Sequence, residues 1–455
     1  MRITIVGGGK VGLSLARNLM QENHEIILVD QNVQVVESAS NALDIMCYVG
    51  NGASFATLKD LEIETSDLII AVTGSDELNL LACHAAHKLG AKHTIARVRA
   101  PEYTGQLYEL KRDLGLSMFI NPERAAAEEI ARILRFPSAS RVELFARGRV
   151  ELVSCRLPAG NKLDGERLAA LFSKFGVKVL ICAIDRGGEL FIPGGNFVLK
   201  AGDELYLTGA PKEMEEAFHR IDLHANPIKS VMIAGGGRIS YYLASALANH
   251  KMRIKIIERE HDVAEELAEQ LPSAVILRGD ASDHDLLLEE GLDKSDAFIA
   301  LTGLDEGNIL SALNARQHDV GKVVAKVNGD NLVKLARALG IETVISPKSV
   351  ITNEILRYVR ALDASSTEDN ILSLYKILDG RAEVLEFVAE TEIPNLTDIP
   401  LSRLSLKKNL LIACIVRGSR TIVPGGNDKI LPGDGILVVT AIRGLNNLSD
   451  ILADD

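Results

Sequence analysis

Short hydrophobic runs alternate with amphipathic stretches over residues 3–120 of the chain. The runs are rich in β-branched residues, which favour buried strands, and the stretches between them carry apolar residues at helical spacing. Strands that alternate with helices build a parallel, doubly wound sheet. We therefore predict a Rossmann-like α/β domain, with strands at residues 3–6, 25–30, 45–49, 67–74, 94–98 and 118–120 and helices at 33–43, 79–89 and 105–114.

The first predicted strand ends in glycines at the spacing Gly-x-Gly-x-x-Gly. Gly7 permits a tight turn, Gly9 lets the backbone approach a pyrophosphate, and Gly12 lets the next helix pack closely on the strand. The N-terminus of that helix offers free N–H groups and the positive end of a dipole to phosphates. Asp30 ends the second strand 18 residues after Gly12, near the place of a ribose-binding carboxylate. These features predict a nucleotide site, and a tight turn without a ligand is the alternative.

Other candidate residues lie where later strands end, because open α/β sheets bind ligands at the carboxyl ends of their strands. Arg97 and Arg99 end the fifth predicted strand, and guanidinium groups suit phosphate oxygens well. For Arg97 the alternative is a surface cation without a partner. The candidates for the first site are Gly7, Gly8, Gly9, Lys10, Val11, Gly12, Asp30, Asn51, Gly52, Thr73, Gly74, Arg97 and Arg99.

From Val142 the pattern changes to short strands separated by turns. An amphipathic helix at 123–135, ended by Pro137, leads into this region. The turns are marked by glycine and proline, as in Pro-Gly-Gly-Asn at 193–196. We predict a small α+β module with strands at 142–145, 151–156, 179–185 and 204–208 and helices near 165–173 and 211–221.

The whole plan then repeats. Gly235 follows a hydrophobic run 228 residues after the first glycine of the opening motif, and Glu258 takes the place of Asp30 at the same offset. The small module recurs as well, because Pro-Gly-Gly-Asn stands again at 424–427. Matches in the same order across both halves indicate a tandem duplication. The predicted domains are two nucleotide-binding domains at 1–123 and 229–350, each followed by an α+β domain, at 142–225 and 369–453.

The second nucleotide site departs from the first. Ser240 stands where the third glycine is expected, so the helix should pack less closely on the strand, and Lys326 replaces the arginine of the first half. Glu258 still supplies an acid, one methylene longer than aspartate. We expect binding there to be weaker or tuned to another nucleotide. The candidates for this site are Gly235, Gly237, Ser240, Glu258, Asp280, Thr302 and Lys326.

Charge and cysteine content narrow the class of protein. The formal net charge of −12 disfavours nucleic acid or an anionic lipid surface as a partner, since both require basic patches. The five cysteines are odd in number and form no Cys-x-x-Cys, which fits reduced thiols. The chain enters a strand at Ile3 and has no apolar run of membrane-spanning length, so we expect a cytoplasmic protein without a signal peptide.

Signals for metal binding and catalysis are poor. His84 and His87 lie on one predicted helix and His93 follows, but no carboxylate or cysteine completes a ligand set. The acidic run at 280–285 is explained more simply by a loop that caps the next helix. A dehydrogenase needs a substrate domain that presents an acid–base residue to the nicotinamide, and the small modules offer only turns. We expect no metal and no catalytic residues, and a site that senses nucleotides.

This ordered set of motifs, present twice, resembles the TrkA family, the regulatory subunits of Trk potassium-uptake systems. Each half is similar to an RCK (or KTN) unit, a TrkA-N domain followed by a TrkA-C domain. The resemblance covers the chain from about Met1 to Ile451. It rests on residues 7–12 with Asp30, 50–54, 71–73, 96–99 and 101–103, and on their counterparts in the second half.

The resemblance implies a cytoplasmic protein, peripheral on the inner face of the cell membrane, that binds NAD(H) and ATP or ADP. It implies a homotetramer-like ring of RCK units beneath an integral-membrane, TrkH- or TrkG-like potassium-translocating subunit. Nucleotide exchange would rearrange the domains and so gate this partner, which requires different affinities for two ring shapes. Two alternatives are an NAD-dependent oxidoreductase and a nucleotide-sensing module of another transporter.

Overall fold

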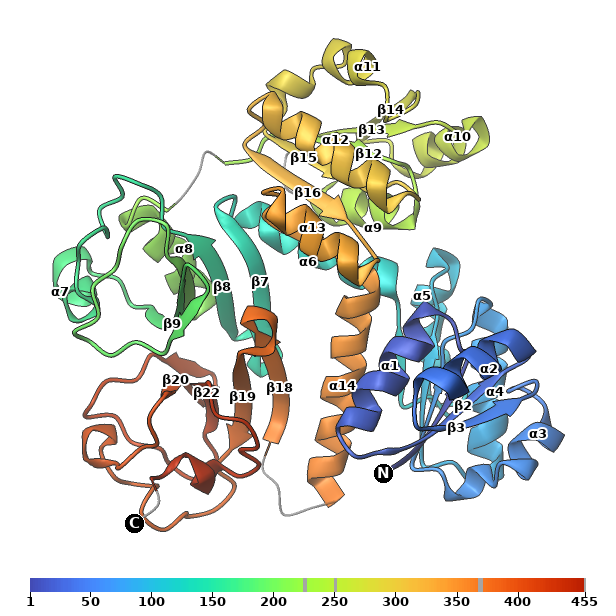
Figure 1. Ribbon diagram of the computed structural model, residues 1–455, viewed down its shortest axis with the longest axis horizontal. Coiled ribbons are helices and arrows are strands. Elements are labelled where there is room, and N and C mark those ends of the chain that lie inside the picture. Colours follow the sequence, from blue (N-terminus) through green and yellow to red (C-terminus); the bar gives the residue numbers. More distant parts are fainter. Residues whose placement is uncertain (224–226, 249–251, 367–370, 454–455) are drawn as a thin grey trace. The chain divides into compact units, whose positions relative to one another are not determined.

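The computed structural model describes residues 1–223, 227–248, 252–366 and 371–453 (Figure 1). The chain forms two compact units. The first comprises Met1–Ala127 and Ile345–Leu356, and the second comprises Glu128–Val344 and Arg357–Asp455. The predicted domain limits at residues 225 and 369 lie outside the described residues.

The first unit is built on a six-stranded parallel sheet with the strand order β3-β2-β1-β4-β5-β6. The order reverses between β1 and β4, so the helices that follow the two sets of strands cover opposite faces of the sheet. The strands are β1 (Arg2–Val6), β2 (Glu25–Asp30), β3 (Met46–Val49), β4 (Leu68–Ala71), β5 (His93–Arg97) and β6 (Met118–Ile120), and the helices are α1 (Lys10–Gln21), α2 (Val33–Ala42), α3 (Phe55–Asp60), α4 (Asp76–Leu89) and α5 (Pro101–Leu110). Helix α6 (Pro122–Arg135) begins in the first unit and continues into the second.

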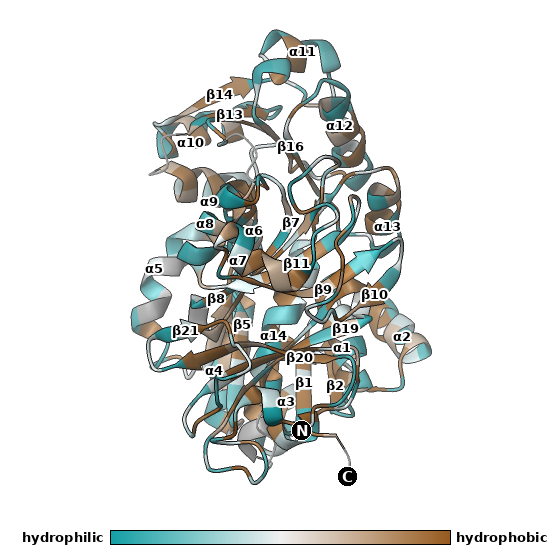
Figure 2. Cartoon of the chain, turned by 90° about the vertical axis from the view of Figure 1, so that its left-hand side faces the viewer, coloured by the Kyte–Doolittle hydropathy of each residue, from teal (hydrophilic) through white to brown (hydrophobic). Residues whose placement is uncertain are grey.

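Apolar side chains hold this sheet between its helices. Ile5 pairs with Leu28 on one side and with Ile70 on the other, and all three side chains are fully buried. Each contributes roughly 1.5–3 kcal/mol relative to an exposed position. Figure 2 shows hydrophobic residues gathered in the strands, while helices such as α2 carry both hydrophobic and hydrophilic residues. Strands that are apolar on both faces are those of a parallel sheet covered by helices, as the sequence predicted.

Two helices begin earlier than the sequence pattern predicted. Helix α5 begins at Pro101 and ends at Leu110, whereas we predicted 105–114. Proline is favoured in the first turn of a helix, where its fixed φ fits and its missing N–H costs nothing. Helix α4 begins at Asp76, directly after Ser75, whose hydroxyl accepts a hydrogen bond from the Leu78 nitrogen and caps the helix.

The first small module is a five-stranded antiparallel sheet with the order β10-β9-β11-β8-β7. The helix predicted at 165–173 is wrong in its extent. Arg167 forms a bridge with Val198, so only a 3-10 turn at Leu168–Ala170 and a short helix follow. The elements are β7 (Ala139–Phe145), β8 (Val150–Arg156), α7 (Leu171–Phe175), β9 (Leu180–Arg186), β10 (Glu189–Phe191), β11 (Glu204–Gly209) and α8 (Pro211–Arg220).

The second half repeats both folds, which confirms the tandem duplication. Its sheets have the orders β14-β13-β12-β15-β16-β17 and β18-β19-β22-β20-β21. In the described part of the second small module, the 3-10 turn at Leu401–Arg403 matches that at Leu168–Ala170, but no α-helix follows it, and a 3-10 turn at Leu448–Ile451 follows the last strand where the first module has α8. The first of these sheets has β12 (Ser230–Ala234), β13 (Arg253–Glu258), β14 (Ala274–Arg278), β15 (Ala297–Ala300), β16 (Lys322–Lys326) and β17 (Thr343–Ile345), with helices α9 (Arg238–Leu247), α10 (His261–Gln270), α11 (His284–Glu289), α12 (Asp305–Gln317), α13 (Asp330–Ala338) and α14 (Pro347–Ser366). The small module has β18 (Ile371–Ile377), β19 (Ala382–Val388), β20 (Leu410–Arg417), β21 (Arg420–Ile422) and β22 (Gly435–Thr440).

The two small modules pack against each other within the second unit, through one shared apolar core. Arg149 of the first module donates to the carbonyl of Gly418, and Arg381, 232 residues later, donates to the carbonyl of Gly188. Tyr375 donates to a carboxylate oxygen of Glu143, and these two positions are also 232 residues apart. The two arginine contacts are therefore exchanged between equivalent places, and Glu143 meets its own counterpart, as in the isologous interface of a two-fold dimer.

Candidate nucleotide-binding site

Glycines shape the loop between β1 and α1. Gly7 has φ of 106°, and a Cβ there would lie 2.9 Å from the backbone nitrogen of Thr73. A Cβ on Gly12 would lie 1.9 Å from the carbonyl oxygen of Gly7. A Cβ on Gly9 would meet no heavy atom within 4 Å. Close packing therefore requires the first and third glycines, while Gly9 presents bare backbone to open space at the start of α1.

Asp30 fastens this loop to the end of β2. Its Oδ2 accepts a hydrogen bond from the Gly8 nitrogen at 2.7 Å, and its Oδ1 accepts one from the Asn32 nitrogen at 2.8 Å. Each carboxylate oxygen has two lone pairs, so both can still accept a hydroxyl. The acid predicted to bind a ribose thus also sets the position of the glycine loop.

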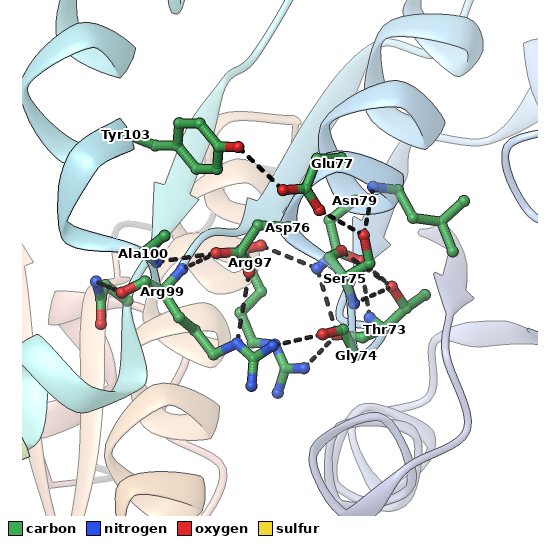
Figure 3. A network of polar contacts seen from close by, with 12 residues as sticks. Thr73, Gly74, Ser75, Asp76, Glu77, Asn79, Arg97, Arg99, Ala100 and Tyr103 are labelled. Atoms are coloured by element: carbon green, nitrogen blue, oxygen red, sulfur yellow. Dashed lines mark hydrogen bonds and ion pairs between the residues drawn. The ribbon is translucent and has the colours of Figure 1, made fainter. Parts of the chain in front are cut away.

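The ends of β4 and β5 form the opposite wall (Figure 3). Arg97 donates to the carbonyl of Thr73, and Arg99 donates to the carbonyl of Gly74. The Thr73 hydroxyl donates to Asn79 Oδ1 at 2.7 Å. The guanidinium groups of both arginines therefore contact the loop that follows β4.

A cavity of about 510 Å³ lies between the glycine loop and these strand ends, at the reversal of the strand order. It is within the size range of small-molecule sites. Among the predicted residues, those that line it are Gly7, Gly9, Lys10, Val11, Asp30, Gly52, Thr73, Gly74 and Arg97. The structure also adds residues that the sequence did not single out, namely Val6, Val29, Gln31, Asn32, Val35, Gly50, Val72 and Leu78.

Four predicted residues are not in the lining of this cavity. Gly8 and Gly12 belong to the packing of the loop, because a Cβ on Gly8 would lie 2.5 Å from the Val35 side chain. Asn51 holds its own turn, with Oδ1 accepting from the Ala53 nitrogen at 3.0 Å. Arg99 follows β5, and its guanidinium donates to the carbonyl of Gly74, which does line the cavity.

The second half reproduces this geometry with its own residues. Glu258 accepts from the Gly236 nitrogen at 2.6 Å and from the Glu260 nitrogen at 2.8 Å, as Asp30 does in the first half. Ser240 is fully buried, and its hydroxyl donates to the Gly235 carbonyl at 2.5 Å. A serine at the third glycine position is therefore accommodated by a hydrogen bond to the loop.

The remaining second-half candidates occupy equivalent places. Thr302 donates from its nitrogen to Asn308 Oδ1 at 2.9 Å, and the Lys326 carbonyl accepts from Asn308 Nδ2 at the same distance. Asp280 is exposed and accepts from the nitrogen and hydroxyl of Ser282, which lowers the pKa of its carboxyl. It forms a turn like that of Asn51, and Gly237 precedes the first turn of α9 as Gly9 precedes that of α1.

Comparison with known proteins identifies the family. The model of the TrkA-N domain matches residues 3–122 and 231–347, and that of the TrkA-C domain matches residues 152–222. The chain belongs to the TrkA family. A "Trk system potassium uptake protein TrkA homolog" of Archaeoglobus fulgidus is 34% identical over 454 residues, which cover 99% of this chain and 100% of the relative. The "Trk system potassium uptake protein TrkA" of Haemophilus influenzae is 32% identical over 444 residues, which cover 96% and 95%.

Solved structures confirm the fold expected for a tandem member of the TrkA family. The "Crystal Structure of the GsuK RCK domain" has a TM-score of 0.63 and 20% identity, and it covers 96% of this chain and 92% of that chain. The "GsuK channel bound to NAD" has a TM-score of 0.64 and 20% identity, and it covers 96% and 76%. Two Rossmann-like sheets, each followed by an antiparallel module, are therefore the RCK arrangement predicted from the sequence.

Sequence reasoning missed two polar residues on the first turns of α4. Asp76 and Asn79 are buried and contact the loops that follow β4 and β5. On α12, Asp305 and Asn308 make equivalent contacts, with Asn308 buried and Asp305 half-buried. A signal was present, because Thr-Gly-x-Asp-Glu-x-Asn occurs in both halves, but the apolar pattern predicted that the helix begins only at Asn79.

The histidines that were weighed as metal ligands have structural neighbours in this member of the TrkA family. His84 Nδ1 lies 3.3 Å from the Leu114 carbonyl, and His93 Nδ1 lies 3.5 Å from the Ser117 hydroxyl. Among the described residues, no group of three or more histidine, cysteine or acidic side chains is arranged to hold a metal ion. Within the same residues, no helix combines the length and apolar character needed to cross a bilayer.

Proposed function

We propose that this chain is the nucleotide-binding regulatory subunit of a Trk potassium-uptake transporter. It binds NAD(H) and ATP or ADP and gates an integral-membrane, TrkH- or TrkG-like translocating subunit from the cytoplasmic side. Membership of the TrkA family, together with a Rossmann-type cavity at the switch point of the sheet, carries the proposal. We keep the domain limits predicted from the sequence, which are residues 1–123, 142–225, 229–350 and 369–453.

The lining of the first cavity favours a dinucleotide with a free ribose hydroxyl. Asp30 stands at the end of β2 and is followed by Gln31 and Asn32, which also line the cavity. A carboxylate accepts from a ribose 2′-hydroxyl, whereas a 2′-phosphate would need a nearby arginine. NAD is the ligand named for the GsuK channel, which shares the fold.

The same lining supports sensing over catalysis. Its ionisable side chains, among the described residues, are Lys10, Asp30 and Arg97. Asp30 is engaged with the glycine loop, and Arg97 stays protonated at any ordinary pH. Acid–base catalysis needs a group that can exchange a proton near neutral pH within reach of the reacting atom. An NAD-dependent oxidoreductase, the alternative, would require such a group to be supplied from elsewhere.

An exposed apolar surface supports assembly into a ring. On α12 and α13 and the residues beside them, Leu304, Leu310, Leu335 and Leu339 are between 47% and 69% exposed. Leu81 and Leu110, at the positions of Leu310 and Leu339 in the first half, are exposed as well. Apolar side chains gathered on neighbouring surface helices mark protein contacts. The small modules already pair with each other inside the chain, so we assign the contacts with other copies to these leucine faces.

Transport measurements test the gating role. Liposomes that contain the translocating subunit take up potassium, and the full chain is added with NADH, NAD, ATP or ADP in turn. We expect uptake to change with the nucleotide in the presence of the chain and not in its absence. Uptake that is the same for every nucleotide would contradict the proposal, and turnover of NADH would favour the oxidoreductase. If the chain binds nucleotides but acts only on another carrier, it is a nucleotide-sensing module of another transporter.

A further inference from the structure

Both halves carry Thr-Gly-x-Asp-Glu-x-Asn across the end of one strand and the start of the next helix. In the first half this segment runs from Thr73 to Asn79, and in the second from Thr302 to Asn308. The aspartate and asparagine are three positions apart in the helix, so they lie on the same face. The glycine-loop motif does not account for either residue.

Asn79 joins the ends of two strands. It is fully buried. Its Oδ1 accepts from the Thr73 nitrogen at 2.8 Å and from the Thr73 hydroxyl at 2.7 Å, and its Nδ2 donates to the Arg97 carbonyl at 2.9 Å (Figure 3). Both partners line the nucleotide cavity. The amide thus fixes the distance between the wall residues Thr73 and Arg97.

Asp76 fixes the segment that follows Arg97. It is 6% exposed. Its Oδ2 accepts from the nitrogens of Arg99 and Ala100 at 2.8 and 2.9 Å, and its Oδ1 lies 3.4 Å from Arg99 Nε. The carboxylate therefore holds both the backbone and the guanidinium of Arg99, whose other end reaches the Gly74 carbonyl.

These contacts are directed at the site and not at the sheet's apolar core. A buried amide or carboxylate that lacks partners is destabilising, so buried polar side chains are found where hydrogen-bond partners satisfy them. Every partner of Asn79 and Asp76 named above lies at the carboxyl end of β4 or β5 or in the loop that follows it. Helix α4 thereby fixes the backbone positions of Arg97 and Arg99 at the end of β5.

In the second half the same contacts are made although neither arginine is present. Asn308 keeps contacts of the same kind to Thr302 and to the Lys326 carbonyl, and Asp305 accepts from the nitrogens of Asn328 and Gly329 at 2.8 and 3.0 Å. Lysine and asparagine stand there in place of both arginines. The aspartate and asparagine therefore position the strand ends whichever side chains those ends carry.

The geometry points to Asp76 and Asn79 as positioning residues for the phosphate-binding wall of the first nucleotide site. This inference rests on the proposed function. They hold Thr73, Arg97 and Arg99 in the arrangement that meets phosphate oxygens, and do so without touching the nucleotide. Their contribution therefore grows with the number of phosphates that the ligand carries. Asp305 and Asn308 hold the equivalent wall of the second site.

Calorimetric titration of the full chain with ATP and with AMP tests the inference. Glu258→Ala isolates the first site, and Asn79→Ala is added to it. We expect ATP affinity to fall about tenfold or more, the scale of one lost hydrogen-bonded contact to a charged group, and AMP affinity to fall clearly less. The selectivity for ATP over AMP therefore decreases. Asn308→Ala in the same background is the matched control and leaves the first site unchanged.

The outcomes distinguish a failure of the positioning role from a failure of the proposed function. If the Glu258→Ala chain binds ATP but Asn79→Ala changes nothing, or lowers ATP and AMP affinity equally, the positioning role is wrong. If neither this chain nor the wild type binds any nucleotide, the proposed function itself is wrong. Should Asn79→Ala not fold, the isosteric Asp76→Asn takes its place. It removes the charge beside Arg99, and the same loss of selectivity is expected.

Discussion

At the scale of single residues, the site is defined by groups that serve the loop and the ligand together. Asp30 accepts two backbone N–H groups and keeps lone pairs for a ribose. Gly7 and Gly12 are needed because a Cβ would strike the backbone of a neighbouring loop. The chain also shows the exception, because Ser240 occupies the third glycine position of the second half and bonds the loop.

Gly12→Ala should destabilise the first half. The new Cβ would lie 1.9 Å from the Gly7 carbonyl oxygen, so backbone must shift. Such overpacking costs about 1–3 kcal/mol in the free energy of unfolding, measured with denaturant. The matched variant is Ser240→Gly, which loses one hydrogen bond without any clash and should cost about 1 kcal/mol. An unfolding free energy of Gly12→Ala equal to that of the wild type would show that the loop tolerates a side chain.

At the scale of elements, hydrophobic periodicity was sufficient for the sheets. Strands such as β1, β2 and β4 are buried on both faces and alternate with helices, so the sequence predicted these elements and their order along the chain. The glycine motif and Asp30 were readable for the same reason, because they stand at the ends of these strands. Helix α5 was misplaced, since the apolar pattern alone ignored the signal of Pro101.

The hydrophobic pattern could not predict the hydrogen bonds that Asp76 and Asn79 of α4 make. Asp76 and Asn79 contact residues that follow the next strand, and such contacts depend on how β4 and β5 pair. An acid at the start of a helix is typical of a cap, so the residue type alone does not predict a contact with the loop that follows β5. Only the repetition of the motif in the second half distinguished it, and repetition does not show which atoms meet.

Strand β16 provides a test that depends on pH. Lys322 is 5% exposed and donates to the Ala139 carbonyl, and burial lowers the pKa of its ammonium to about 8. Glu342 opposes this shift. In the unfolded chain a lysine holds its proton up to about pH 10.4, so between these values the unfolded state binds more protons. The cost of burying the charge is therefore present below about pH 8 and is relieved as the pH rises to about 10.

Lys322→Met should remove this dependence. We expect the free energy of unfolding of the variant, relative to wild type, to be about 2 kcal/mol lower at pH 10 than at pH 7. The carbonyl that loses its donor contributes equally at both values. Denaturant titrations at a series of pH values give the difference. A difference that does not vary with pH would mean that Lys322 stays charged in the folded protein.

At the scale of the whole molecule, duplication has placed a two-fold pairing inside one chain. The small modules of both halves share a core and exchange equivalent arginine contacts. A surface that in a single-module protein would join two copies is thereby used within the chain. In the proposed ring, the contacts between chains use other faces, and the leucines on and beside α12 and α13 form one of them.

Leu310→Glu combined with Leu339→Glu should dissociate the proposed ring. Both side chains are exposed in the chain, at 64% and 47%, and would place two charges in an apolar contact. Light scattering of the purified protein should report a smaller assembly. Val275→Glu, on β14 and 54% exposed, is the control and should leave the assembly intact. An unchanged mass for the double variant, or dissociation by the control as well, would exclude this face as the contact.

Calorimetric titration of the full chain with NADH, NAD, ATP and ADP, beside Asp30→Ala and Glu258→Ala, tests the central claim most directly. A two-site nucleotide sensor predicts binding without turnover, at two sites of which each variant loses one. Saturation at one site, with wild-type binding by Glu258→Ala, would make the second half a structural copy. No binding of any of the four nucleotides would contradict the account and leave only its fold.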